Sequence, residues 1–155
     1  MKILALDLST TRSGYALAEE GKITQFGFIK PKASAPVFER ILYTIVEVTK
    51  LIDQYEPDEL VVEDVYMQFA QSYGLLGRLQ GCCIWAWYKK SGKLLHMVEC
   101  SHARKVMGLK VPRGKEGKQV VINYVKQLVH PDIDNDDTAD ACLIALCWLV
   151  EHAKN

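Results

Sequence analysis

Hydrophobic and polar positions along the chain predict strands first and helices afterwards. Residues 2–8 form an almost continuous apolar run, which is typical of a strand that is buried on both faces and central to a sheet. Residues 14–18 and 23–29 indicate two further strands, joined by a tight turn at residues 20–22. Because the links between these strands are short, we expect an antiparallel meander.

Apolar residues then recur at helical spacing from Val37 to about Tyr55, and Pro57 ends the helix that they predict. The β-branched run at residues 60–65 predicts a fourth strand. Because a long helix separates it from the first three strands, this strand should run parallel to one of them.

The rest of the chain continues to alternate between helices and strands. We expect, in order, a helix over residues 68–88, a strand over 94–98, a short helix over 101–107, a loop rich in glycine, proline and lysine over 108–117, a helix over 119–129, and a last helix from Asp136 or Asp137 to Leu149. This order predicts an α/β fold with a mixed five-stranded sheet, three antiparallel strands plus two parallel, flanked by helices. We expect the 155 residues to form a single domain.

Three glycines, Gly74, Gly77 and Gly81, lie inside the helix predicted over residues 68–88. A glycine weakens an exposed helix by about 1 kcal/mol relative to alanine. Their presence therefore suggests that another backbone, either the sheet or a second subunit, approaches this helix closely.

The composition is that of a soluble globular protein, with 49% hydrophobic and 25% charged residues. No long run is free of charge, and the amino terminus lacks the apolar region of a signal peptide. We therefore expect a cytoplasmic or nucleoid protein with no membrane partner.

The five cysteines are odd in number and contain no C-x-x-C pair, so we expect reduced, mostly buried thiols. Cys100 and His102 could join Cys82 or Cys83 around zinc, but without a paired spacing this site is disfavoured.

Nineteen basic and nineteen acidic residues cancel, but they are unevenly distributed. Cations concentrate at Arg104, Lys105, Lys110, Arg113, Lys115 and Lys118, and acids follow at Asp132, Asp134, Asp136, Asp137 and Asp140. A neutral sum can thus hide a basic rim around an acidic pocket.

Carboxylates meet the ends of two predicted strands and the start of the last helix. Asp7 interrupts the first apolar run, and Glu63 and Asp64 follow that of the fourth strand. Neighbouring residues on a strand face opposite sides of the sheet, and we expect Glu63 to share a face with Asp7 because it directly follows the apolar run. Asp137 and Asp140 are three residues apart and share one face of a helix.

Each of these carboxylates also has an ordinary structural explanation, because acidic side chains favour turns and helix starts. If the four converge, however, they must bind protons or cations. Two Mg²⁺ ions about 4 Å apart, held by oxygen ligands, are the usual arrangement where phosphodiesters are cut.

The segments 4–9, 61–66 and 137–141 together resemble the RuvC family of Holliday junction resolvases, and the resemblance spans nearly the whole chain. It implies a ribonuclease-H-like fold and a homodimer that hydrolyses four-way DNA junctions in recombination and repair. It also implies two Mg²⁺ ions per active site, with Mn²⁺ as a substitute. The four acids that would hold them are Asp7, Glu63, Asp137 and Asp140.

By the same resemblance, Tyr66 would stack on bases near the crossover, and the helix over residues 68–88 would supply the dimer interface. Tyr66 could equally be a core residue, and so could the large apolar side chains of the helix. The basic segment departs from the lysine pattern of the family, but its cations could still hold phosphates. These candidate DNA-binding residues are Arg104, Lys105, Lys110, Arg113, Lys115 and Lys118.

Other functions remain open at this point. A nuclease of the same fold could act on RNA or on other branched DNA, and a catalytically inert relative could bind branched nucleic acid without cutting it. Residues 7–11 with Gly14 also resemble the first phosphate loop of actin-like ATPases and sugar kinases, which need two such lobes to enclose a nucleotide. The compact length and the deviating basic loop are compatible with a phage-borne protein.

Overall fold

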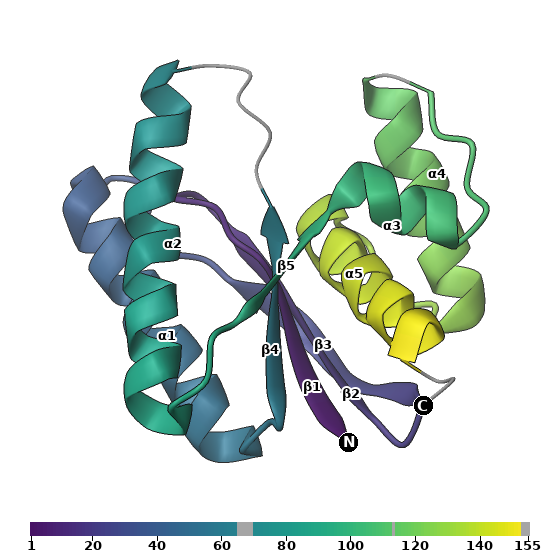
Figure 1. The fold of residues 1–155 in the computed structure, drawn as a ribbon. Coiled ribbons are helices and arrows are strands. Elements are labelled where there is room, and N and C mark those ends of the chain that lie inside the picture. Colours follow the sequence, from purple (N-terminus) through teal and green to yellow (C-terminus); the bar gives the residue numbers. More distant parts are fainter. Residues whose placement is uncertain (65–69, 113, 153–155) are drawn as a thin grey trace.

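Five strands form one mixed sheet in the computed structural model, which describes residues 1–152 apart from 65–69 and 113, with the backbone only for residues 70–73. The strands are β1 (Lys2–Asp7), β2 (Ser13–Glu19), β3 (Lys22–Ile29), β4 (Glu59–Asp64) and β5 (His96–Glu99). Their order is β3-β2-β1-β4-β5 (Figure 1). The pairs β1–β2 and β2–β3 are antiparallel, whereas β1–β4 and β4–β5 are parallel. The predicted sheet is therefore confirmed.

Helices cover both faces of the sheet. On one face lie α1 (Val37–Tyr55) and α2 (Ala70–Ser91), and on the other lie α3 (Cys100–Val106), α4 (Lys115–Leu128) and α5 (Asp136–His152) (Figure 1). Strand β1 faces both layers, because Ile3 and Ala5 pack in the core with α5 while Leu4 and Leu6 pack in the core with α1 and α2. This double burial explains the nearly continuous apolar run at the amino terminus.

The loop predicted over residues 108–117 is wrong in its last part, because α4 begins at Lys115 instead of residue 119. Gly114 has a φ of 79° and precedes the helix, and Gly117 lies in its first turn. A Cβ at position 117 would lie 2.0 Å from the backbone oxygen of Pro112. This glycine therefore allows the first turn of α4 to pack closely against the preceding loop and is not itself part of that loop.

The glycines of α2 do not contact the sheet. A Cβ added at Gly74, Gly77 or Gly81 would meet no heavy atom of the described residues within 4 Å. The expectation that the sheet approaches them is wrong, and the second subunit remains as a prediction. The helix was expected from residue 68 to 88; its predicted start lies outside the described residues, and it ends at Ser91.

Helix α5 contacts the sheet closely at Gly14, which pairs with Asp7 across β1 and β2. A Cβ at Gly14 would lie 1.9 Å from the backbone oxygen of Asp137, so only glycine allows this approach. The hydroxyl of Thr138 donates a hydrogen bond of 3.0 Å to the backbone oxygen of Gly27 on β3. The small residues near the start of α5 thus bring its first turn against the end of β1.

All five cysteines are free thiols, as predicted. Among the described helices, none combines the length and the apolar character that crossing a membrane requires.

Candidate functional site

Asp7 and Glu63 end two adjacent parallel strands. Strand β1 pairs with β4 in a register that aligns Leu6 with Val62, so the next residue of each strand, Asp7 and Glu63, lies at the same edge of the sheet. Side chains alternate along a strand, which places Asp64 on the opposite face, and Asp64 is exposed. The structure therefore brings Glu63, and not Asp64, beside Asp7.

The first turn of α5 brings Asp137 and Asp140 to this edge. Asn135 caps the helix, because its side-chain oxygen accepts a hydrogen bond of 2.9 Å from the backbone N–H of Thr138. From this start, α5 lies over β2 at Gly14, and Asp140 is one turn further along. The approach seen at Gly14 thus brings a carboxylate from α5 to those of β1 and β4.

Burial and mutual repulsion dominate the electrostatics of these acids. Burial raises the pKa of Asp7 well above its usual value, and the hydrogen bond and negative charge of Glu63 raise it further, followed by the charges of Asp140 and Asp137. Burial and the charge of Glu63 raise the pKa of Asp140 to about 6, although Arg104 opposes this shift. Without a cation, Asp7 and Asp140 therefore keep their protons to a higher pH than an ordinary aspartate does.

The donor set fits a hard divalent cation. The side-chain oxygen Oδ1 of Asp140 is buried and accepts no hydrogen bond from the described residues. Desolvating a carboxylate oxygen without a hydrogen-bond donor is costly, and a cation would offset that cost. The acids offer oxygen ligands, which suit Mg²⁺ and Mn²⁺. Asp7, Glu63 and Asp140 are therefore the candidate ligands at this edge, although their oxygens do not all lie within 4.8 Å of one another in this structure.

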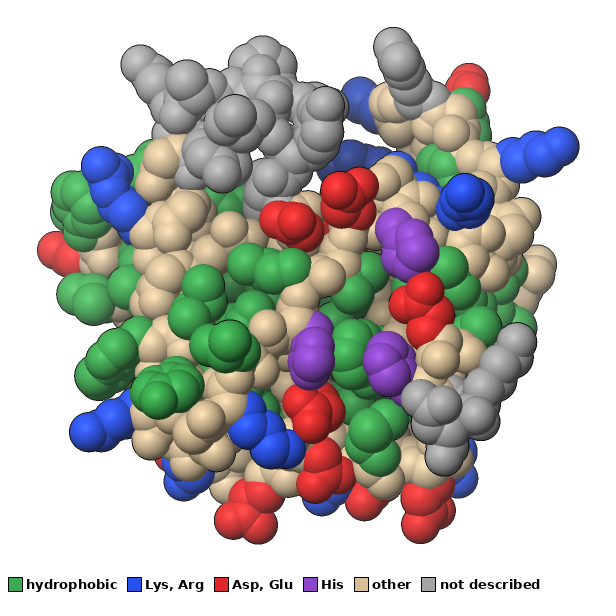
Figure 2. All heavy atoms as spheres, viewed as in Figure 1, with side chains coloured by type: hydrophobic (Ala, Val, Ile, Leu, Met, Phe, Trp, Pro, Cys, Tyr) green, Lys and Arg blue, Asp and Glu red, His purple; other side chains and the backbone are tan. Residues whose placement is uncertain are grey.

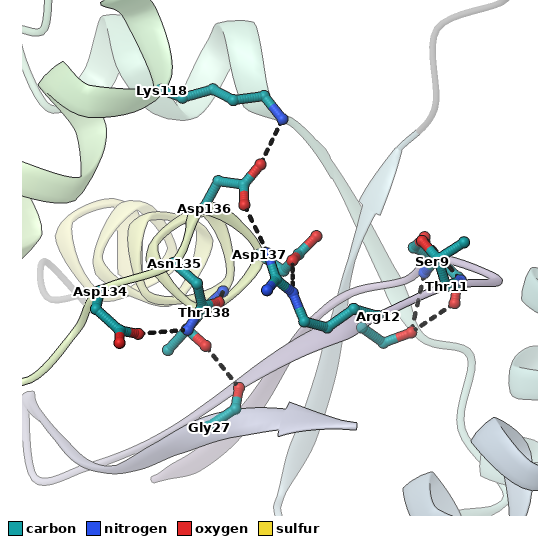
Figure 3. A network of polar contacts seen from close by, with 11 residues as sticks. Ser9, Thr11, Arg12, Gly27, Lys118, Asp134, Asn135, Asp136, Asp137 and Thr138 are labelled. Carbon is teal, nitrogen blue, oxygen red and sulfur yellow. Dashed lines mark hydrogen bonds and ion pairs between the residues drawn. The ribbon is translucent and has the colours of Figure 1, made fainter. Parts of the chain in front are cut away.

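Asp137 is engaged differently, by an arginine that the sequence analysis missed. Arg12, in the loop after β1, donates from Nε to Asp137 and from a terminal nitrogen to Asp136 at 2.9 Å (Figure 3). Lys118 on α4 pairs with the other oxygen of Asp136. The only signal in the sequence is that Arg12 is the first cation after Asp7, and its partner lies 125 residues away.

The predicted basic rim lies beside the acids. Arg104 on α3 approaches Asp140 at 3.7 Å. Arg104, Lys105 and Lys110 line a hollow of about 470 Å³, and Lys115 and Lys118 line another, of about 290 Å³. Two predicted DNA-binding residues, Tyr66 and Arg113, lie outside the described residues.

Cys100 is a second residue that the sequence analysis did not assign to the carboxylate site. It begins α3 and lies close enough to the acids that burial, chiefly, and the charges of Glu63 and Asp140 raise the pKa of its thiol. It is therefore a neutral, protonated thiol beside the carboxylates. The disfavoured zinc site of Cys100 and His102 with Cys82 or Cys83 is not among the potential metal-ligand groups of the described residues.

The raised pKa of Asp140 predicts how stability depends on pH. A carboxyl whose pKa rises from 3.8 to about 6 on folding contributes stability that is fully present below pH 4 and is lost as the pH rises through 6. In EDTA at pH 8, Asp140→Asn should therefore unfold at a higher urea concentration than the wild type. Its free energy of unfolding should be greater by on the order of 2 kcal/mol, and this difference should shrink toward pH 4. Asp64→Asn, on the exposed side of the strand end, is the control and should show no such trend. Equal stability of wild type and Asp140→Asn at pH 8 would contradict this electrostatic description.

Comparisons with known proteins identify the family of this chain. The family model described as "Crossover junction endodeoxyribonuclease RuvC" matches residues 3–148. A RuvC of Protochlamydia amoebophila is 32% identical over 94% of this chain and 88% of its own length, and one of Pelobacter propionicus is 27% identical over 98% and 88%.

Solved structures share the fold. The structure titled "T. thermophilus RuvC in complex with Holliday junction substrate" superposes with a TM-score of 0.81 at 16% identity, covering 100% of this chain and 97% of that one. A fowlpox virus resolvase, solved with Holliday junction DNA, gives a TM-score of 0.64 at 10% identity, covering 97% and 98%. The family match and the relatives together establish that this chain belongs to the RuvC family of crossover junction endodeoxyribonucleases.

Proposed function

We propose that this protein resolves Holliday junctions by divalent-metal-dependent hydrolysis of phosphodiester bonds. The observation that carries the proposal is the meeting of Asp7, Glu63 and Asp140 at one edge of the sheet, where their burial makes a cation favourable. Membership of the RuvC family supports both the reaction and the branched DNA substrate. An ATPase module of the actin or sugar-kinase type would need a second lobe of this fold, and nothing in the site favours it.

The acids would hold two Mg²⁺ ions, with Mn²⁺ as a substitute, and the ligands would be Asp7, Glu63, Asp137 and Asp140. The chemistry that such cations supply is activation of the attacking water and stabilisation of the leaving oxygen. Arg12 engages one oxygen of Asp137, so this carboxylate could hold a cation through its other oxygen while the ion pair is kept. If Arg12 instead leaves Asp137, its guanidinium would be free to pair with a DNA phosphate.

The cations around the acids would position the DNA backbone. A hollow of about 390 Å³ next to Asp136 and Asp137 is lined by four cations, Arg12, Lys30, Arg40 and Lys118. The hollow of about 470 Å³ adds Arg104, Lys105 and Lys110. Contacts of this kind give salt-dependent affinity that is independent of sequence. Lys115, Arg113 and Tyr66 complete the proposed DNA-binding set.

The outer face of α2 supports a homodimer. Gly74, Gly77, Gly81 and Trp85 follow one another at helical spacing along an exposed face, and the indole of Trp85 is 67% exposed. Hydrophobic side chains gather on this side of the molecule, over α1 and α2 (Figure 2). Because nothing in the described chain approaches the glycines, a second subunit would explain why this face carries them. A two-fold pair of active sites also suits a junction with two-fold related arms.

Cleavage of a synthetic four-way junction tests the reaction. Asp7→Asn and Glu63→Gln should each lower the rate at least about 100-fold, because loss of a metal ligand removes several kcal/mol of transition-state stabilisation. Asp64→Asn, which neutralises the neighbouring acid on the opposite face, should retain cleavage. EDTA should abolish the activity and Mg²⁺ should restore it.

The same assay distinguishes the other nuclease functions. Three-way junctions, flaps, linear duplexes and RNA–DNA hybrids serve as parallel substrates, and the four-way junction should be cut fastest. Equal cutting by wild type and Asp7→Asn would remove the proposed role of the acids. Faster cutting of an RNA strand or a flap would overturn the assignment of the junction as substrate.

Sedimentation equilibrium tests the dimer. Gly77→Leu adds a side chain where the described chain leaves open space, so the subunit should fold normally while the dimer dissociation constant rises about tenfold or more. Gln127→Leu adds the same side chain to an exposed position of α4 and should leave the dimer intact. A Gly77→Leu protein that dimerises like the wild type would show that the interface lies elsewhere.

A further inference from the structure

Three side chains with metal-binding atoms meet at the end of α5 that lies away from the acids. They are His102 on α3 and Cys147 and Glu151 on α5, and their nitrogen, sulfur and oxygen atoms all lie within 4.8 Å of one another. It is the only such group among the described residues. We propose that this group, the His–Cys–Glu site, binds Zn²⁺ or a similar thiophilic divalent cation.

The spacing of the atoms is close to that of a tetrahedral zinc site. His102 Nε2 and Glu151 Oε1 are 2.8 Å apart, and Cys147 Sγ is 3.7 Å from Glu151 Oε2. Metal–ligand bonds of about 2.0–2.3 Å put neighbouring ligands of a tetrahedron about 3.3–3.6 Å apart. The two contacts end on different oxygens of Glu151, so a bound ion would require a small rotation of the carboxylate and a small shift of the imidazole.

The His–Cys–Glu site is buried on the side of Cys147 and open to solvent on the side of His102 and Glu151. Cys147 is fully buried, whereas the side chains of His102 and Glu151 are 49% and 36% exposed. Histidine and acidic side chains gather on this face, over α3, β5 and the carboxyl end of α5 (Figure 2). Protein would supply three ligands from within, and water could complete the coordination from the solvent side.

The His–Cys–Glu site differs from the carboxylate site in chemistry and in place. Thiolate and imidazole ligands favour zinc, whereas an all-oxygen set favours Mg²⁺. Cys147 follows Asp140 by seven residues, which is about 10 Å along a helix. Burial, with Glu151, raises the pKa of the Cys147 thiol to about 12, so binding of the metal would release a proton from sulfur.

The site would tie α3 to α5. These helices also carry Arg104 and Asp140, which approach each other at 3.7 Å next to the acids. A metal at the His–Cys–Glu site would therefore resist separation of the two helices that form this contact. The consequence is a zinc-dependent gain in thermal stability, independent of the nuclease reaction.

Titration with Co²⁺ in excess Mg²⁺ tests the proposal on the full chain. Binding should produce the near-ultraviolet absorption of a cobalt–thiolate bond, and Zn²⁺ should bleach it by displacement. The thermal midpoint should rise with Zn²⁺, and the heat of binding should vary with the ionisation enthalpy of the buffer because a proton is released.

Variants assign the signal to its ligands. His102→Ala, at an exposed position, should weaken Co²⁺ binding about tenfold or more, and Cys147→Ala should remove the thiolate band. His130→Ala and Cys82→Ser, which remove a histidine and a cysteine outside the site, should leave both unchanged. An unaltered band in Cys147→Ala, or full affinity in His102→Ala, would overturn the proposal. Junction cleavage in Mg²⁺ by His102→Ala should match the wild type, so that this result and the proposed function can fail separately.

Discussion

The close contact between α5 and the sheet at Gly14 is the constraint on which the site depends. With any side chain at this position, the backbone of Asp137 would have to move away from β2, because a Cβ would lie 1.9 Å from its oxygen. Strands β1 and β4 bring Asp7 and Glu63 together by their register alone. The third carboxylate arrives only because the helix lies against the strand, where Thr138 also bonds to Gly27.

This contact brings carboxylates close together at a cost in electrostatic repulsion. Nearby arginine side chains reduce that repulsion. Three acids crowd one edge of the sheet, and burial pushes the pKa of Asp7 and of Asp140 upward. Arg104 lies near Asp140, whereas Arg12 occupies Asp137. Among the described residues, Asp7 and Glu63 thus have no cationic side chain as a partner, whereas Asp136, Asp137 and Asp140 lie beside arginine or lysine side chains that could move to phosphate. A cation-binding site of this kind trades stability of the metal-free fold for affinity.

Much of the fold followed from the sequence because its signals are local. The double burial of β1, the helical repeat from Val37 and the short links between the first strands each predicted an element that the structure contains. The glycine-rich loop was predicted too long, because Gly117 lies in the first turn of α4 and makes a close contact with Pro112 in the preceding loop. A glycine in the sequence alone does not distinguish a loop position from a close contact made by a helix.

The candidate site was predictable only in part, for a related reason. Alternation along a strand indicated that only one of Glu63 and Asp64 shares a face with Asp7, and the end of the apolar run favoured Glu63. Helical spacing placed Asp137 and Asp140 on one face. The ion pair of Arg12 with Asp137 spans 125 residues and has no periodic signal. The grouping of His102 with Cys147 and Glu151 likewise depends on how α3 packs on α5.

Diffraction from crystals grown with Mn²⁺, recorded with its anomalous signal, tests the central claim most directly. We expect anomalous peaks among the side chains of Asp7, Glu63 and Asp140, with an oxygen of Asp137 close to one of the ions. Peaks only elsewhere, with no ion between Asp7, Glu63 and Asp140, would contradict the account.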